Sequence, residues 1–224
     1  MSKQNVCLAQ PSYMSSSSVP FPAGIGALAA YAWSFADIDE SFRLKEIICL
    51  REPQAQLLAR LDAPVVFGFS CYMWNIEYNK LLARRVKEKY PDCLILFGGP
   101  QVPEGAYLLE QCPFIDVLIH GEGEIAFLML LRAVRDGAPF AQIPNLSYRE
   151  NGAVVTTPPQ AVCKVDFPSP VTSGFFDRLL AEHPDLEFTP LIESGRGCPN
   201  HCAYCSWGSK DTGMRLFPLE RVYG

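Results

Sequence analysis

Three cysteines near the end of the sequence, Cys198, Cys202 and Cys205, have the spacing Cys-x3-Cys-x2-Cys. Cysteine thiolates are the usual protein ligands of iron–sulfur clusters, and a [4Fe–4S] cluster held by protein alone normally uses four of them. Three thiolates therefore leave one iron open. An iron that can bind a substrate-like molecule distinguishes a catalytic cluster from an electron carrier, so the spacing predicts a [4Fe–4S] cluster that takes part in a reaction.

A structural zinc site is the alternative interpretation of these cysteines, because Cys-x2-Cys pairs are common zinc ligands. His201 could complete a Cys3His set. However, His201 lies directly beside Cys202, which is an awkward place for a fourth ligand, and no second cysteine pair follows. A disulfide is less expected still in a cytosolic protein. The sequence favours the iron–sulfur cluster and leaves zinc open.

The composition limits the possible functions. The 224 residues are 49% hydrophobic, which is enough for one full-sized core and part of a second. The net charge is −5 and no stripe of Lys and Arg is present, so nucleic acid is not an expected partner. The N-terminus lacks the apolar region of a signal peptide, and no apolar run approaches the ~18 residues of a membrane span. We expect a cytoplasmic protein without a membrane partner.

Six further cysteines are scattered along the chain, and several lie in apolar runs, where cysteine behaves as a small buried hydrophobic residue. They are Cys7, Cys49, Cys71, Cys93, Cys112 and Cys163.

Short apolar runs alternate with helical patterns from residue 5 to residue 137, which is typical of a doubly wound parallel sheet. Most of the runs are apolar on both faces, as strands between two helix layers must be. We predict a five-stranded, parallel, Rossmann-like (flavodoxin-like) sheet flanked by helices. The predicted strands are 6–10, 44–50, 65–72, 94–98 and 117–120, and the predicted helices are 24–35, 54–61, 75–90, 104–111 and 124–135.

The pattern changes after residue 137. Residues 146–148 and 154–157 flank Asn151 and Gly152, a strong hairpin signal, and a Pro-rich stretch follows at 158–170. A helix at 175–183 and a strand at 188–193 then lead into the cysteines. We expect a sheet domain at 1–140, a hairpin and linker at 141–187, and the start of a second domain at 188–224.

Open parallel sheets bind ligands outside the carboxyl ends of their strands. The segments that follow the predicted strands here are rich in glycine and in hydroxyl groups, which allow close approach of a ligand and donate hydrogen bonds without bulk. This arrangement suits a bulky, flat cofactor. The residues concerned are Gln10, Ser12, Ser70, Cys71, Tyr72, Met73, Gly98, Gly99, Gly121, Glu122, Gly123 and Glu124.

Each of these segments also has an explanation that needs no ligand. The paired glycines could be present simply to form a tight turn. Glu122 and Glu124 lie at a predicted helix N-terminus, where carboxylates are favourable in any case. Tyr72 and Trp74 could be core or interface aromatics. The order of the segments carries more weight than any one of them.

The cysteine spacing resembles that of the radical S-adenosylmethionine (SAM) superfamily. The resemblance implies a loop that follows the first strand of a partial (β/α) barrel, with SAM bound to the open iron and cleaved by one electron to give a radical that abstracts hydrogen. It also implies that Tyr204, just before the third cysteine, lies beside the adenine of SAM.

The order of four segments resembles that of the cobalamin-binding radical SAM enzymes, and the resemblance covers essentially the whole chain. The segments are a PxGxxxLAA-like helix start at 22–30, GGP at 98–100, HGEGE at 120–124 and the cysteine loop. The resemblance implies that the segments after the strands bind cobalamin, with Ser70 to Met73 beside the corrin and Gly98, Gly99, Gly121 and Glu122 beside the nucleotide tail. The DxHxxG motif that supplies a histidine to cobalt elsewhere is absent. His120 follows Asp116 at the wrong spacing.

The resemblance implies methyl transfer to an unactivated carbon or phosphorus centre, with a small-molecule or peptide substrate and an electron donor such as flavodoxin or ferredoxin. Only 19 residues follow Cys205, so we expect just the start of the barrel and no activity from this chain alone. A cyclase of the anaerobic magnesium-protoporphyrin ester type and a cobalamin-binding module with a structural metal remain alternatives. A tRNA methylthiotransferase, with Cys7, Cys49 and Cys71 around a second cluster, is disfavoured by the GGP and HGEGE segments.

Overall fold

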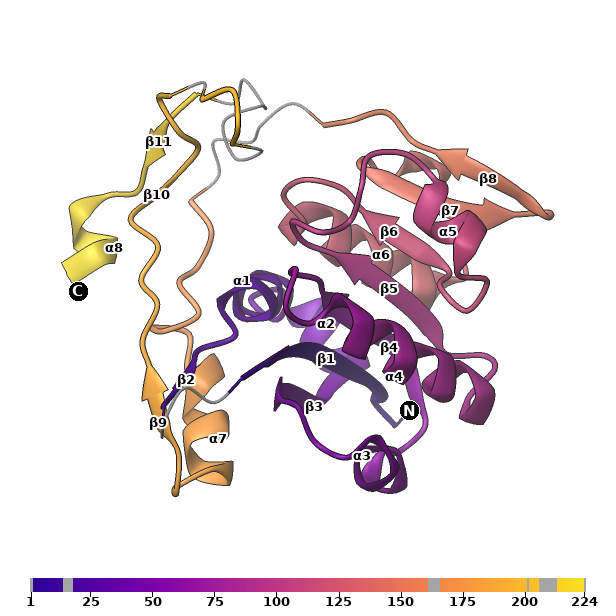
Figure 1. Ribbon diagram of the computed structural model, residues 1–224, viewed down its shortest axis with the longest axis horizontal. Coiled ribbons are helices and arrows are strands. Elements are labelled where there is room, and N and C mark those ends of the chain that lie inside the picture. The colour runs from indigo at the N-terminus through magenta and orange to yellow at the C-terminus, as the bar shows by residue number, and fades with distance from the viewer. Residues whose placement is uncertain (1, 14–17, 161–165, 201, 206–212, 224) are drawn as a thin grey trace.

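The computed structural model describes residues 2–13, 18–160, 166–200, 202–205 and 213–223. Its centre is a seven-stranded sheet in the order β3-β1-β4-β5-β6-β7-β8 (Figure 1). The first five strands in this order are parallel, and β7 and β8 are antiparallel additions. The strands are β1 (Gln4–Ser12), β3 (Phe42–Leu50), β4 (Pro64–Ser70), β5 (Leu94–Gly98), β6 (Val117–Ile119), β7 (Leu146–Glu150) and β8 (Ala153–Thr156).

The predicted five-stranded parallel sheet is confirmed, and the hairpin extends it. Strand β7 pairs with β6 through Val117 and Tyr148, so the hairpin that we placed with the connecting segment belongs to the same sheet. Because the hairpin covers β6, the parallel part of the sheet has β3 as its open edge.

Helices cover both faces of the sheet, which explains why the strands read as continuous apolar runs (Figure 1). In β1, Val6 and Leu8 pack on one core and Cys7 and Ala9 on the other. The first core lies under α1 (Ala23–Ala32), α2 (Ala36–Ser41) and α6 (Glu124–Asp136), and the second lies under α3 (Gln54–Arg60), α4 (Ile76–Lys89) and α5 (Tyr107–Gln111).

Two details of the helices were not evident from the sequence. Leu81 of α4 is apolar but 55% exposed, because it lies about 100° around the helix from the buried Leu82. Helix α5 begins at Tyr107 rather than at residue 104. Gly105 just before it has a φ of +82°, which is incompatible with a helix and delays its start.

The segment after the hairpin folds back onto the N-terminal region. Strand β9 (Glu187–Thr189) pairs in parallel with β2 (Ser18–Pro20), and Phe21 stacks on Phe176 of α7 (Phe175–Glu182) with ring centroids 4.1 Å apart. Arg178 of α7 donates hydrogen bonds of 2.7 Å to the carbonyl oxygens of Leu44 and Lys45. Helix α7 is thereby fixed beside the open edge of the sheet.

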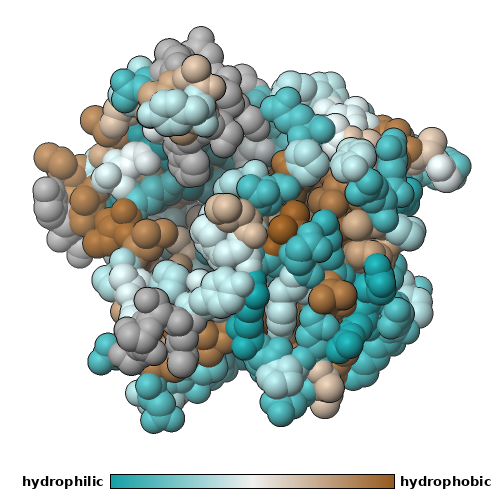
Figure 2. All heavy atoms as spheres, in the orientation of Figure 1, coloured by the Kyte–Doolittle hydropathy of each residue, from teal (hydrophilic) through white to brown (hydrophobic). Residues whose placement is uncertain are grey.

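The strand predicted at 188–193 is only three residues long, since Pro190 has no N–H to continue the pairing. Further on, β10 (Gly195–Arg196) pairs with β11 (Arg215–Leu216), and α8 (Leu219–Tyr223) follows. Figure 2 shows apolar side chains gathered on the left, over these segments. Exposed apolar residues here include Leu191, Ile192, Met214, Leu216 and Leu219. That these elements begin a barrel stays a prediction.

Candidate functional site

The candidate cofactor site lies at the carboxyl edge of the sheet, where β1 and β4 are neighbours. The chain passes from β1 to β3 on one side of β1 and reaches β4 on its other side, so the connections diverge at the place where open parallel sheets bind their ligands in a crevice. Gln10, Ser70 and Tyr72 meet there around Gly24 of α1. A Cβ at Gly24 would lie 2.7 Å from Gln10 Oε1 and 2.9 Å from Ser70 Oγ, so only glycine lets α1 approach this closely. Three predicted residues thus converge.

Two buried asparagines hold the loop after β4 by hydrogen bonds. Asn75 and Asn79 are fully buried. Asn75 donates to the carbonyl oxygens of Pro11 (3.2 Å) and Ser70 (3.1 Å) and accepts from the amide of Tyr72 (2.8 Å). One side chain therefore ties the ends of β1 and β4 together and fixes the direction of the loop. Sequence reasoning missed both asparagines, because we assigned them only to a helix.

The loop that Asn75 holds presents aromatic and apolar surface. Tyr72 stacks on Trp74 with centroids 4.5 Å apart, and Met73 between them is 77% exposed. Burial raises the pKa of the Tyr72 hydroxyl, its hydrogen bond with Ser70 opposes this, and the charge of Glu193 adds to the increase. Tyr72 is therefore a neutral hydrogen-bonding group. It is also affected by the charge of Glu193, which belongs to the segment leading to the cysteines.

Of the two paired glycines, only Gly99 is required by the backbone. It has a φ of +97°, and a Cβ there would lie 2.9 Å from both the nitrogen and the oxygen of Cys71. A Cβ at Gly98 would make ordinary contacts with Ile119. Gly121 has a φ of +67° and open space where a side chain would be. Gly99 thus has a structural role in the loops, and Gly121 leaves room beside the edge.

The two glutamates of the HGEGE segment bind arginines from the cysteine region. Glu124 accepts from Arg196 at 2.5 Å, although the carboxylate is only 5% exposed, and Glu122 pairs with Arg215 and lies 3.5 Å from Arg196. Sequence reasoning placed both glutamates beside cobalamin and overlooked both arginines. A contact of this segment with cobalamin stays a prediction. The backbone of the segment is better placed for such a contact than the two carboxylates, which bind the arginines.

His120, the nearest candidate for a cobalt ligand, is engaged with the hairpin. Its Nε2 lies 2.8 Å from Ser147 Oγ, and its amide donates to the carbonyl oxygen of Asn145 at 2.8 Å. Ser147 is fully buried in β7. The side chain therefore fixes the end of β6 to the added strand, which agrees with the absence of the DxHxxG motif.

The eight cysteines that the structure describes fall into two classes. Cys198 and Cys205 are half-buried and Cys202 is exposed, whereas the others are buried. Burial raises the pKa of Cys49, Cys71 and Cys93 to about 12. A thiolate is the form that binds metal, so the buried thiols are unsuited to be ligands, whereas the loop cysteines are accessible to a metal.

The described residues do not bring three potential ligands together in an assembled metal site. Tyr204 is 92% exposed, so the described residues do not pack around the side chain expected beside the SAM adenine. His201, the proposed fourth zinc ligand, and Cys163 lie outside the described residues. The cluster assignment of Cys198, Cys202 and Cys205 therefore rests on their spacing and their accessibility.

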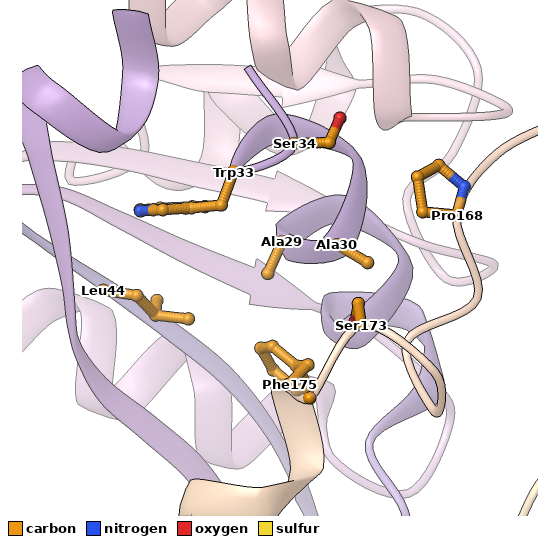
Figure 3. A pocket seen from close by; sticks show the side chains of 9 residues that line it. Ala29, Ala30, Trp33, Ser34, Leu44, Pro168, Ser173 and Phe175 are labelled. Carbon is orange, nitrogen blue, oxygen red and sulfur yellow. The ribbon is translucent and has the colours of Figure 1, made fainter. Parts of the chain in front are cut away.

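A cavity of about 300 Å³ lies elsewhere, between α1, the start of α7 and β3. Figure 3 shows Phe175 beneath Ala29, with Trp33 and Leu44 on one side and Ser173 and Pro168 on the other. Its lining is mostly apolar and contains no titratable side chain. It offers no group for chemistry and is separate from the carboxyl edge.

No protein-family model matches the chain, but curated proteins do. The 2-(S-pantetheinyl)-carbapenam-3-carboxylate methyltransferase of Streptantibioticus cattleyicolor is 35% identical over 213 residues. The cobalamin-dependent radical SAM methyltransferase TokK of Streptomyces tokunonensis is 35% identical over 211 residues. Each comparison covers 91% of this chain and 31% of the relative. The chain belongs to the cobalamin-binding radical SAM family. It spans about a third of the length of these curated relatives.

Solved structures of this family share the fold. OxsB, solved with aqua-cobalamin and SAM, matches with a TM-score of 0.73 at 16% identity, over 98% of this chain and 30% of OxsB. TsrM from Kitasatospora setae, solved with cobalamin and a [4Fe–4S] cluster, matches with a TM-score of 0.66 at 18% identity, over 99% of this chain and 44% of TsrM. The family and the fold class predicted from the motifs are confirmed.

Two alternatives from the sequence become weaker. The anaerobic magnesium-protoporphyrin IX monomethyl ester cyclase of Rubrivivax gelatinosus is 27% identical over 207 residues, less than the two methyltransferases. A methylthiotransferase cluster on Cys7, Cys49 and Cys71 is incompatible with the fold, because Cys49 packs in the core on the opposite face of the sheet from the other two.

The structure has no helix, in the parts that it describes, of the length and apolar character needed to cross a membrane.

Proposed function

We propose that this chain provides the cobalamin-binding domain and the cluster-binding loop of a cobalamin-dependent radical SAM methyltransferase that acts on an unactivated carbon or phosphorus centre of a small molecule. The observation that carries the proposal is the contact of Arg196, two residues before Cys198, with Glu124 at the carboxyl edge of the sheet. This contact supports a position of the cysteine loop beside the edge at which open parallel sheets bind their ligands. Two cofactors bound at these two places would face one another.

The chemistry of the cysteine residues fits a [4Fe–4S] cluster. Cys198, Cys202 and Cys205 are the accessible thiols among the described cysteines, and their spacing leaves one iron for SAM. Zinc would need a fourth ligand. Together the bound cofactors would supply a methyl group on cobalt and a radical from SAM, and a small protein such as flavodoxin or ferredoxin would supply the electron.

The crevice fits a large, flat cofactor such as cobalamin. Gln10, Ser12, Ser70 and Tyr72 would offer hydrogen bonds at its floor, and the exposed Met73 would offer apolar contact to the macrocycle. Cys71, Gly98, Gly99 and the loop Gly121 to Glu124 would border it through their backbone. In this arrangement the protein orients the cofactor and excludes water from one of its faces.

The test of the cluster is anaerobic reconstitution of the chain with iron and sulfide, followed by iron and sulfide analysis and by electron paramagnetic resonance (EPR) of the reduced sample. We expect a [4Fe–4S] signal in the wild type, its loss in Cys202→Ala, and its retention in Cys112→Ala, which changes a buried cysteine outside the loop. A wild-type chain that binds only zinc, or a signal unchanged in Cys202→Ala, would overturn the cluster assignment. Zinc binding would support the binding-module alternative.

Cobalamin binding is tested separately by retention of hydroxocobalamin on a desalting column. Met73→Asp would place a carboxylate against an apolar macrocycle, and we expect retention to fall by about tenfold or more, since an uncompensated buried charge costs more than 1.4 kcal/mol. Leu81→Asp, at an exposed leucine of α4, is the matched control and is expected to retain wild-type binding. Equal retention in the two variants would show that cobalamin does not bind over this loop.

A further inference from the structure

A compact group of charges joins the HGEGE loop to the strand before the cysteines. Arg196 lies among Glu122, Glu124 and Glu193, and we call these four residues the Arg196 node. The guanidinium is 2.5 Å from Glu124, 3.0 Å from Glu193 and 3.5 Å from Glu122, measured from nitrogen to oxygen. The side chains of Arg196 and Glu124 are only 13% and 5% exposed. Water therefore screens this contact much less than an ion pair at the surface.

The node keeps Arg196 charged in spite of its burial. Burial opposes the charge, but the hydrogen bonds to Glu193 and Glu124 raise the pKa of Arg196 above its usual range. A planar guanidinium with several donors suits a site that offers several carboxylates in fixed directions, and lysine could not satisfy them all. The geometry is thus specific to arginine.

A second arginine uses the same loop. Arg196 of β10 stands directly opposite Arg215 of β11, an arrangement of like charges that would by itself oppose the pairing of the two strands. Glu122 contacts both side chains and removes this conflict. The pairing of β10 with β11 therefore depends on the HGEGE loop of the sheet domain, although the two lie far apart in the sequence.

The connection from the node to the first cysteine is a single residue. Gly197, between Arg196 and Cys198, has a φ of +89°, and a Cβ there would collide with the carbonyl oxygen of Gly213. The backbone at this point admits only glycine and packs against the chain before β11. With one closely packed residue between them, a shift of Arg196 would also move Cys198.

We propose that Arg196 is a positioning residue, which Glu124 and Glu193 hold so that the cysteine loop has a fixed place over the carboxyl edge of the sheet. The ion pairs of Arg196 are with glutamates, so it acts on the cysteines through the loop. This inference rests on the proposed function, because the spacing that the node sets would be that between the cluster and cobalamin. It also assigns docking, rather than cofactor binding, to the Glu122 and Glu124 side chains.

A purely stabilising role is the competing explanation, but a buried ion pair contributes little net stability compared with a well-packed apolar replacement. Such pairs are better suited to fixing one arrangement among several. The rest of the chain offers a control, because Arg178 also makes several hydrogen bonds, to Glu182 and to two carbonyl oxygens, and it anchors α7 instead.

The first test needs no cofactor. Backbone hydrogen exchange, followed by mass spectrometry, is compared among the wild type, Arg196→Gln, Glu124→Gln and Arg178→Gln. We expect the amides of 194–198 and 214–217 to exchange at least about tenfold faster in the first two variants, with unchanged protection of β4 and β5. Arg178→Gln is expected to affect α7 only. Unchanged exchange at 194–198 in both Arg196→Gln and Glu124→Gln would overturn the proposal.

The second test uses the chain loaded with cluster and cobalamin. Two paramagnetic centres at a fixed separation enhance one another's relaxation, so the EPR saturation of cob(II)alamin is measured with the cluster oxidised and reduced. We expect Arg196→Gln to bind both cofactors at wild-type stoichiometry with at least about a twofold weaker enhancement, and Arg196→Lys to recover part of it. An enhancement equal to that of the wild type in Arg196→Gln would overturn the proposal.

The two proposals fail in different ways. If the wild type binds no cluster or no cobalamin, the proposed function fails, while the exchange experiment still reports on the docking of the loop. If the wild type binds both and neither measurement changes in Arg196→Gln, the positioning role fails alone. Retained protection in β4 and β5 separates either result from general unfolding.

Discussion

At the carboxyl edge of the sheet, Asn75 and Asn79 are fully buried and hold the loop after β4 by hydrogen bonds from below. In the cysteine loop, by contrast, Cys202 and Tyr204 are exposed, and the strands on either side are only two residues long. One region is built as part of a packed domain, and the other is held by a few charged contacts. The carboxyl edge of the sheet is therefore formed by folding of the domain, whereas the place of the cysteine loop depends on docking.

Thiol reactivity gives the largest expected contrast between the two regions. Alkylation of the cofactor-free chain, read out by peptide mapping, should modify Cys198, Cys202 and Cys205 at least about a thousandfold faster than Cys71 and Cys93. The buried thiols must wait for opening of the core, which costs several kcal/mol. Comparable rates for all five would mean that the sheet domain is not closed. A denatured sample, in which all cysteines react alike, is the control.

Core truncation should separate the regions by their contribution to stability. Phe97→Ala removes a fully buried ring from β5 and should lower the free energy of unfolding by about 3–5 kcal/mol. Leu216→Ala, at an exposed leucine of β11, should change it by less than about 0.5 kcal/mol. Urea denaturation measures both. A large loss in Leu216→Ala would contradict the view that the cysteine region adds little to the stability of the domain.

The buried amide beneath the loop should have an intermediate effect. Asn75→Ala leaves the amide of Tyr72 and the carbonyl oxygen of Pro11 without their side-chain partner and removes one of the two side-chain hydrogen bonds to the carbonyl oxygen of Ser70, which should cost about 1–3 kcal/mol of unfolding free energy. Asn5→Ala, which loses one hydrogen bond to the carbonyl oxygen of Asp62, is the matched control and should cost no more than about 1 kcal/mol. If the two variants are equally stable in urea, Asn75 does not fix the loop.

The smallest effect concerns an exposed ion-pair network, the counterpart of the buried Arg196 node. Hydrogen bonds from Arg132 and then from Arg135 hold the pKa of Asp37 well below its usual range. The contribution of Asp37 to stability is present above its unfolded pKa of about 3.9 and is lost as the pH falls below that value. Thermal midpoints measured between about pH 6 and about pH 3 should therefore fall less steeply in Asp37→Asn than in the wild type. Asp92→Asn, at an exposed aspartate, should keep the wild-type slope.

Features that depend on neighbours in the sequence were predictable. The parallel strands were recognisable because they are apolar on both faces. The paired glycines at 98 and 99 marked a turn, although only the structure shows that Gly99 alone of the two requires glycine. The cysteine spacing is local as well, and it indicated the radical SAM superfamily; the order of the segments before it indicated the cobalamin-binding branch. Helix α2 was missed because six residues are too few for a helical period to be recognised.

Features that depend on distant partners were not predictable. Strand β2 has a partner only in β9, so its three residues read as the end of a serine run. Arg196 and Glu124 are 72 residues apart, and either one alone reads as a solvated charge. The same holds for Asn75, whose role lies in reaching the carbonyl oxygen of Pro11 in another strand. A sequence shows the chemistry of such residues but not their interaction partners in the fold.

The pairing of Ser18–Pro20 with Glu187–Thr189 has a consequence for the order of events on the ribosome. The early segment leaves the exit tunnel long before its partner, which is about 170 residues later and arrives roughly 10 to 30 s afterwards at ~5–20 residues per second. During that interval the sheet can form, while the edge of β2 stays open to any extended chain nearby. The sheet domain can therefore fold before the cysteine segment is made, while β2 waits for β9 to leave the tunnel.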